Sequence, residues 1–223
     1  MKIIAKREAI LSPLQAVIGV VERKQTMPIL ANVLVAAKGG KLSITATDLE
    51  VELVATSDVD VQRGGEITIP GRKLLDICRA LPDGTEITLT QEGERMLVRA
   101  RKSRFTLTTL PAAEFPTVEE INAEQTLQLP QKDFKRLLDK THFSMAQQDV
   151  RYYLNGLLLE TSAKRLRAVA TDGHRLALCE VELANGGKAR QQVIVPRKGV
   201  LELQRILGNE DQLLEVSIGS NHL

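Results

Sequence analysis

Apolar residues in this chain follow two spacings, one typical of short helices and one typical of strands. Residues 7–21 carry four apolar side chains on one predicted helical face, namely Ile10, Leu14, Val17 and Val21. Pro13 removes one backbone donor from this helix, so we expect a bend there or a first turn close to it. Apolar and polar residues then alternate in three predicted strands, at residues 30–37, 41–47 and 50–59.

The same order of elements begins again at residue 66. A strand at 66–69 and a helix at 72–81 precede three more strands, at residues 86–91, 95–101 and 104–110. The rest of the chain repeats the plan with strands at residues 127–130, 154–160, 165–171, 174–183, 191–195 and 213–219, and helices at residues 132–145 and 197–207. Serial β-α-β-β-β units predict an α+β fold, with helices on one face of each domain and antiparallel sheets on the other.

The two halves of the chain are repeats of each other. Displaced by 124 residues, Ala46, Thr47 and Asp48 fall on Ala170, Thr171 and Asp172, and a displacement of 126 carries Ile69 and Pro70 onto Val195 and Pro196. We therefore predict two homologous domains, residues 1–122 and 123–223. The second lacks the last two strands of its own plan, so we expect this chain to be part of a longer protein.

Basic residues concentrate in the predicted helices, although the formal net charge of the 223 residues is only +2. The helical windows hold 14 basic and 6 acidic residues, whereas the remainder holds 16 basic and 22 acidic residues; the windows are residues 6–24, 71–82, 131–142 and 197–208. This distribution favours a basic helical surface facing a polyanion. Without a base-reading motif, phosphate attraction would be salt-sensitive and independent of sequence.

Candidate chemistry is sparse. His174 and Cys179 would lie five residues apart on one strand, with side chains on opposite faces, which argues against a hydrolase. Cys78 and Cys179 look like buried small hydrophobes, and no motif has metal-ligand spacing. We expect no catalytic residue, metal site or cofactor. Charges at residues 6–8 and the lack of any apolar stretch of roughly 20 residues predict a cytoplasmic protein without a membrane segment.

One segment differs between the repeats. Asp172 and Gly173 are a turn signal followed by His174 and Arg175, whereas the first copy, residues 48–51, has neither Gly nor His and reads as an ordinary strand entry. The alternatives for this segment are a local turn and a binding surface. The polar loop at residues 147–153 ends in both tyrosines of the chain and could contact DNA or simply precede a strand.

Several segments together resemble the bacterial DNA polymerase III beta subunit family. They are QQDVRYYLNG (residues 147–156), VATDGHRLA (169–177), VIVPRKGVLEL (193–203), TDLEVELV (47–54), DICRALP (76–82) and RFTLTTLPAAEFP (104–116). The resemblance runs along the whole chain. It implies a three-domain protomer that dimerises head-to-tail into a ring lined by helices, encircles duplex DNA as a processivity factor, and has no enzymatic activity.

The resemblance also assigns residues to three surfaces. It implies a partner-peptide pocket at Leu154, Thr171, Gly173, His174, Arg175 and Leu176. It implies DNA contacts at Lys24, Arg72, Gln148, Tyr152, Tyr153, Arg197 and Lys198. It implies a dimer interface at Lys73, Arg95, Lys102, Arg104, Phe105 and Leu107.

The resemblance implies duplex DNA as one partner. It also implies protein partners: the polymerase III catalytic subunit, clamp-loader subunits, and other polymerases and repair proteins with short clamp-binding motifs. A homodimer is expected for the full-length protein. The alternative to a ring is a nucleic-acid-binding scaffold that does not encircle DNA.

Overall fold

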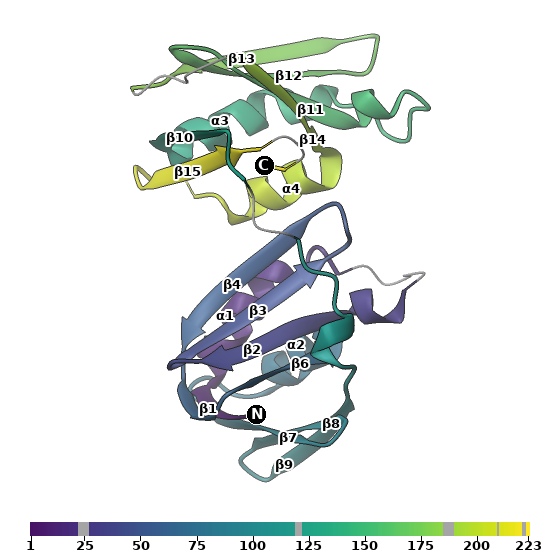
Figure 1. The fold of residues 1–223 in the computed structure, drawn as a ribbon, viewed down its shortest axis with the longest axis vertical. Helices are drawn as coiled ribbons and strands as arrows, with labels where there is room; N and C mark the ends of the chain where they lie inside the picture. The colour runs from purple at the N-terminus through teal and green to yellow at the C-terminus, as the bar shows by residue number, and fades with distance from the viewer. Residues whose placement is uncertain (22–26, 119–121, 185–189, 209, 220–221) are drawn as a thin grey trace. The chain divides into compact units, whose positions relative to one another are not determined.

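The computed structural model describes residues 1–21, 27–118, 122–184, 190–208, 210–219 and 222–223. The chain forms two compact units, Met1–Val118 (unit 1) and Glu119–Leu223 (unit 2). Figure 1 traces both units from the N-terminus in purple to the C-terminus in yellow. Within the described residues, no helix is long and apolar enough to cross a membrane.

Unit 1 follows the predicted β-α-β-β-β order twice. Its elements are β1 (Lys2–Lys6), α1 (Arg7–Val17), the 3-10 helix η1 (Pro28–Ala31), β2 (Asn32–Lys38), β3 (Lys41–Thr47), β4 (Glu52–Asp58), β5 (Asp60–Arg63), β6 (Gly65–Pro70), α2 (Gly71–Ala80), β7 (Glu86–Glu92), β8 (Arg95–Ala100), β9 (Ser103–Thr108) and η2 (Ala112–Glu114). The short strand β5 was not predicted, because it continues β4 almost without a break; the backbone passes at Val59 into a second sheet.

Each β-α-β-β-β half of unit 1 pairs its last three strands with one another but gives its first strand to the sheet of the other half. The two sheets have the orders β4-β3-β2-β6 and β5-β1-β7-β8-β9. Strand β6 of the second half therefore completes the first sheet, where Thr68 is opposite Leu34. Strand β1 of the first half pairs with β7, where Ile3 is opposite Leu89. Each half thus completes the hydrogen bonding of the other.

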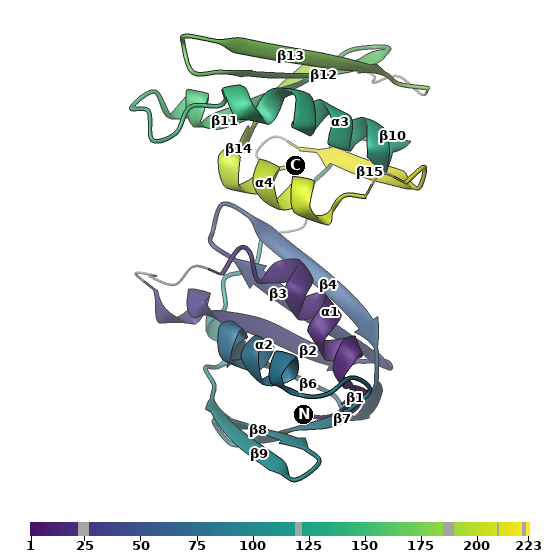
Figure 2. The same cartoon turned by 180° about the vertical axis from the view of Figure 1, so that it is seen from behind.

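The two helices lie side by side against the sheets. Figure 1 shows the β4-β3-β2-β6 sheet in front of α1 and α2, and Figure 2, from behind, brings both helices forward. Their apolar faces are buried in one core with both sheets, through Ile10, Leu14 and Val17 of α1 and Leu74, Leu75 and Cys78 of α2. The predicted α+β arrangement of helices against antiparallel sheets is confirmed.

Helix α1 ends at Val17, four residues before its predicted end. Val20 and Val21 are nevertheless almost fully buried, because they enter the core from the turn that follows the helix. Apolar periodicity reports burial and so extended the predicted helix too far.

Pro13 lies well inside α1 and leaves the Ala9 carbonyl without its usual intrahelical donor. The hydroxyl of Ser57 on β4 donates a hydrogen bond of 2.6 Å to that carbonyl. The sheet therefore satisfies an acceptor that proline leaves open in the helix packed against it.

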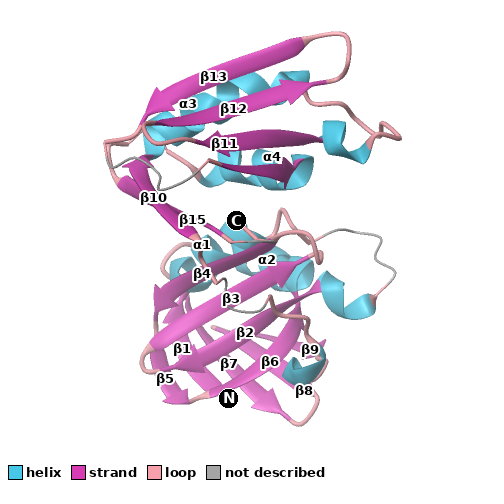
Figure 3. Ribbon diagram, turned by 45° about the horizontal axis from the view of Figure 1, so that its top comes forward, coloured by secondary structure: helices cyan, strands magenta, loops and turns pink. Residues whose placement is uncertain are grey.

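Unit 2 repeats the plan. Its elements are β10 (Gln125–Pro130), α3 (Gln131–Thr141), η3 (His142–Ser144), η4 (Tyr152–Asn155), β11 (Gly156–Thr161), β12 (Arg165–Thr171), β13 (Leu176–Glu182), β14 (Gln191–Pro196), α4 (Arg197–Ile206) and β15 (Leu213–Ile218). The sheets β13-β12-β11-β14 and β10-β15 show the same exchange of strands as unit 1. Figure 3 shows the sheet of β11, β12 and β13 with α3 behind it.

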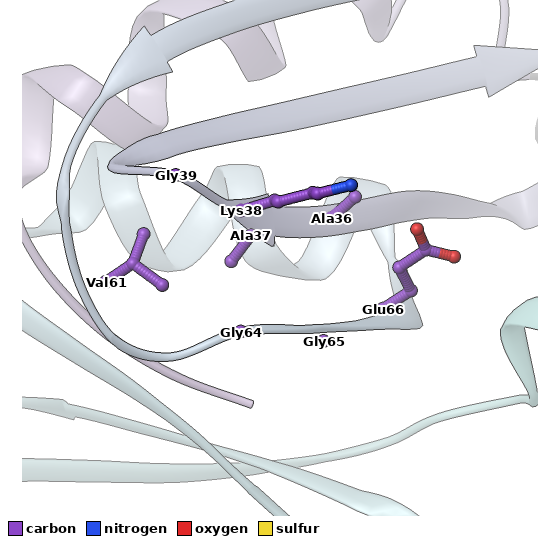
Figure 4. Close-up of a pocket in the computed structure, with 8 residues that line it drawn as sticks. All are labelled: Ala36, Ala37, Lys38, Gly39, Val61, Gly64, Gly65 and Glu66. Atoms are coloured by element: carbon purple, nitrogen blue, oxygen red, sulfur yellow. The ribbon is translucent and has the colours of Figure 1, made fainter.

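A shallow hollow of about 280 Å³ opens in unit 1 between the β2–β3 turn and the β5–β6 connection. Figure 4 shows its lining residues, with the side chains of Lys38 and Glu66 at one side. Gly64 and Gly65 leave it open by lacking side chains; a Cβ at Gly64 would lie 3.0 Å from the Ala37 carbonyl oxygen. The hollow is a shallow depression between strands, and none of the predicted site residues lines it.

Replacing Ser57 with Ala should lower the free energy of unfolding by about 1 kcal/mol, because it leaves the Ala9 carbonyl unpaired. In a Pro13→Ala background the new backbone N–H can bond to that carbonyl, so the same replacement should cost distinctly less. Denaturant unfolding of the four proteins measures this difference. The exposed Ser103→Ala serves as the control, and equal losses in both backgrounds would contradict the interpretation.

Candidate functional site

The turn at residues 171–176 connects β12 to β13 and presents its side chains outward. Asp172 organises it: its Oδ1 accepts hydrogen bonds from the backbone N–H groups of His174 (2.9 Å) and Arg175 (3.0 Å). The Thr171 hydroxyl accepts from Gly173 N–H at 3.1 Å and donates to the Arg175 carbonyl at 2.7 Å. Gly173 has φ +89°.

These contacts hold the Asp172 carboxylate in its charged form. The two backbone donors, followed by the Arg175 guanidinium with Nε 2.9 Å from Oδ2, lower the pKa of Asp172 to about 2. On its other side, the Arg175 guanidinium lies 5.9 Å from the centre of the Phe143 ring. These contacts within the protein therefore define the conformation of the turn.

Unit 1 contains the same turn. Oδ1 of Asp48 accepts from the backbone N–H groups of Glu50 (3.0 Å) and Val51 (2.8 Å), and Thr47 accepts from Leu49. Leu49, equivalent to Gly173, also has a positive φ, +80°. The interpretation of residues 48–51 as an ordinary strand entry was wrong, because Asp and Thr side chains stabilise this turn without glycine or histidine.

The six residues predicted for a peptide pocket lie at one end of a sheet. Leu154 lies in η4, which directly precedes β11, and the turn joins the end of β12 to β13. Neighbouring strands here are antiparallel, so these ends meet at the same edge. Leu154 is buried, whereas the Leu176 side chain is 63% exposed. Leu176 is thus an apolar group available to a ligand beside Arg175.

A second ordered loop, residues 145–155, carries other predicted contacts. Asp149 and Asn155 close it through two hydrogen bonds of 2.9 Å, each between a backbone group of Asp149 and the Asn155 amide. Arg151 binds the Asp149 carboxylate through Nε (3.0 Å) and Nη2 (2.9 Å). This pairing, with the Arg151 backbone N–H, lowers the pKa of Asp149 to about 2. Sequence reasoning did not identify this group, although an Asp two residues before an Arg was a usable signal.

The residues predicted to contact DNA have varied surroundings. In the loop, Tyr152 is 82% and Tyr153 51% exposed, and their rings pack edge-to-face at 5.9 Å. Gln148 is also exposed and has φ +58°. Lys198 is half-buried on α4, and Lys24 lies outside the described residues.

Two predicted DNA contacts occupy similar places in the two units. Arg72, at the start of α2, donates to the Val21 carbonyl. Arg197, at the start of α4, donates to the Met145 carbonyl at 3.5 Å. Val21 and Met145 are themselves equivalent in the repeat. In both units, an arginine at the N-terminus of the second helix donates a hydrogen bond to a backbone carbonyl in the segment that follows the first helix.

Part of the predicted helical positive charge is neutralised within the protein. Lys132 pairs with Asp211, and Arg205 pairs with Glu202. Lys135 donates to the Gln204 carbonyl at 2.9 Å. The exposed cations Arg72, Lys73 and Arg79 of α2 and Lys140 of α3 are better placed for a polyanion. The excess of basic residues in the helices therefore does not translate one for one into exposed positive charge.

The predicted dimer residues gather around the β8–β9 hairpin, except Lys73, which is exposed on α2. Strand β9 is the last of its sheet and carries exposed Arg104 and partly exposed Phe105. Leu107 is only 7% exposed and packs into the core of unit 1, so its side chain offers little surface to a second subunit.

Sequence reasoning overlooked two further cations of this hairpin, Arg99 and Arg101. With Arg95, Lys102 and Arg104 they make five exposed cations within residues 95–104. Arg99 lies directly opposite Arg104 in the strand register. Like charges facing each other across strands are unfavourable, and a negatively charged partner would relieve that repulsion.

The predicted chemistry of His174 and Cys179 needs one correction. His174 lies in the turn, before β13 begins at Leu176, so the two residues do not share a strand. Cys179 packs against the core of unit 2. The other cysteine, Cys78, is buried in unit 1, and this burial raises the pKa of its thiol to about 11. Among the described residues, no group of three or more His, Cys, Asp or Glu side chains could hold a metal ion.

Two family models match in succession along the chain. The DNA polymerase III beta subunit N-terminal domain matches residues 1–119, and the central domain of the same subunit matches residues 128–223. The chain belongs to the DNA polymerase III beta subunit family.

Individual family members are close in sequence and in structure. The beta sliding clamp of Pseudomonas aeruginosa is 53% identical over 219 residues, which are 98% of this chain and 60% of that protein. That of Escherichia coli K12 is 52% identical over 224 residues, 100% of this chain and 61% of that protein. A crystal structure of the P. aeruginosa DNA polymerase III subunit beta superposes with a TM-score of 0.94 at 52% identity, covering 99% of this chain and 60% of that one.

The chain thus spans about 60% of the length of these relatives. In the family's terms, the Asp172 turn and the Asp149 loop both lie in the central domain, whereas the β8–β9 hairpin lies in the N-terminal domain.

The turn should be sensitive to acid. Because the folded pKa of Asp172 is depressed to about 2 from 3.8, its stabilising effect is fully present above pH 4 or so and is lost as the pH falls through 2. A carboxyl-carbon NMR titration should place its midpoint near 2, whereas a midpoint near 3.8 would show that the contacts do not persist in solution. Asp172→Asn should remove this part of the pH dependence.

Proposed function

We propose that the chain supplies the first two domains of a sliding clamp, residues 1–122 and 123–223, in a protein that also contains a third domain. The single observation that carries the proposal is the ordered match of the N-terminal and central domain models along the chain. The clamp acts as a processivity factor in the cytoplasm. It catalyses no reaction, but keeps other enzymes on duplex DNA.

The DNA contact rests on charge and stacking without base recognition. Arg72, Lys73 and Arg79 form an exposed cationic face on α2, which attracts phosphates regardless of sequence. Tyr152 and Tyr153 offer aromatic faces, which can stack on unpaired bases where duplex and single strand meet. Lys24, Gln148, Arg197 and Lys198 complete the proposed contacts.

The partner site is the turn that ends at Leu176. An exposed leucine beside an arginine that Asp172 and Phe143 hold in place suits a short peptide with apolar and polar anchors. We assign to this site the polymerase III catalytic subunit, clamp-loader subunits, and other polymerases and repair proteins that carry short clamp-binding motifs.

Ring closure uses the edge strand β9. Its open backbone groups and the five cations of the hairpin suit an acidic strand edge from a second subunit. The full-length protein then forms a head-to-tail homodimer, with Lys73, Arg95, Lys102, Arg104 and Phe105 at the contact. Leu107 supports this surface from the core.

Encirclement predicts a dependence on DNA topology. The full-length protein, loaded on a nicked circular duplex by its clamp loader, should stay with the DNA through gel filtration and be lost when a restriction enzyme cuts the circle. A closed ring can slide off linear DNA at a free end but stays on a circle. Phosphate attraction alone does not distinguish circular from linear DNA. Equal retention on both would favour a scaffold that does not encircle DNA.

The peptide site predicts a loss of affinity from small changes in the turn. Arg175→Ala and Leu176→Ala, each in the full-length protein, should weaken binding of a fluorescent C-terminal peptide of the polymerase III catalytic subunit by roughly tenfold or more. Leu49→Ala is the control, because Leu49 is similarly exposed in the equivalent turn of unit 1. Unchanged affinity in both turn variants would exclude this assignment.

A further inference from the structure

Gly173 lies against the guanidinium of Arg151. A Cβ added at Gly173 would lie 3.3 Å from Nη2 and 3.5 Å from Nη1 of Arg151. The turn at residues 171–176 and the loop at residues 145–155, which the chain separates, therefore come close together where Gly173 faces Arg151.

The turn itself does not explain the glycine. Leu49 adopts nearly the same positive φ at the equivalent position, with the same pattern of Asp and Thr hydrogen bonds. The residue of unit 1 that corresponds to Arg151 is Met27. Unit 1 thus has Met27 and Leu49 where unit 2 has Arg151 and Gly173, so the side chain absent at Gly173 makes room for the guanidinium.

Arg151 cannot give way easily at this contact. Its guanidinium is held by both oxygens of Asp149, and its carbonyl accepts the Leu154 N–H at 2.8 Å. The Asp149 backbone is fastened in turn to Asn155. The close approach at Gly173 therefore lies between two segments that are each held by their own hydrogen bonds.

We propose that Arg151 is a positioning residue that fixes the loop bearing Gln148, Tyr152 and Tyr153 to the turn bearing His174, Arg175 and Leu176. The two segments form one surface, and a nucleic-acid ligand on the loop is coupled to a peptide on the turn. The identity of these ligands rests on the proposed function, whereas the mechanical connection does not.

The internal repeat supplies the decisive variant. Gly173→Leu introduces the residue that the same turn accommodates in unit 1, so the amides of His174 and Arg175 should keep their protection from hydrogen exchange. The leucine side chain displaces Arg151, and exchange at the Arg151 and Leu154 amides should rise about tenfold. Arg151→Met, which introduces the other unit 1 residue, should have the same effect on the loop.

Leu49→Gly is the matched control and should leave exchange in the loop unchanged. Unaltered loop exchange in both Gly173→Leu and Arg151→Met would overturn the proposal. If Gly173→Leu exposed the turn amides as well, the turn amides of Arg151→Met, whose turn sequence is intact, would decide the question. Raised exchange at those amides would support the connection and unchanged exchange would overturn it, because loss of the Asp149 pair by itself loosens only the loop.

Coupling is measured as the change in polymerase-peptide affinity when the full-length clamp is loaded on primed circular DNA. We expect about a fivefold change in the wild type and none in Arg151→Met, which a purely structural role of Arg151 would not produce. Equal changes in both proteins, or none in the wild type, would overturn the coupling. A wild type that binds no peptide would reject the proposed function and the coupling, whereas hydrogen exchange would still test the connection.

Discussion

Exchange of one strand between consecutive β-α-β-β-β halves is the constraint on which each unit depends. β1 is hydrogen-bonded to β7, and β6 is hydrogen-bonded to β2, so neither half of unit 1 has a complete sheet alone. Helix α1 must then run from one sheet to the other, and its apolar face is buried against both. Ser57 on β4 fits this arrangement closely enough to satisfy the carbonyl that Pro13 leaves open.

The internal repeat presents different side chains on the same turn framework in the two units. Both units build the same Asp-centred turn, with the Asp side chain accepting from backbone N–H groups in each. The two turns differ in the other side chains that they carry. Unit 1 has Leu49 and Val51, whereas unit 2 has Gly173 and Arg175 at the equivalent positions. Because the framework hydrogen bonds come from Thr and Asp, these outer residues could change without loss of the turn.

Electrostatics gives the two units different surfaces. In unit 1 the positive charge lies on α2 and on the β8–β9 hairpin, where Arg99 faces Arg104. In unit 2 the helical cations Lys135 and Arg205 have partners within the unit, and the exposed aromatic groups lie on the loop instead. The net charge of a helix does not describe this distribution of exposed charge, because it does not show which cations already interact with groups of the same protein.

The sequence by itself determined the element order, the internal repeat, the α+β class and the family, since periodicity and short motifs are local properties of the chain. It predicted β3 and β12 at their observed bounds. Only the tertiary structure decided the strand exchange, the end of α1 at Val17 and the contact of Arg151 with Gly173. These depend on residues distant in the chain, and apolar spacing reports that a side chain is buried without specifying its partner.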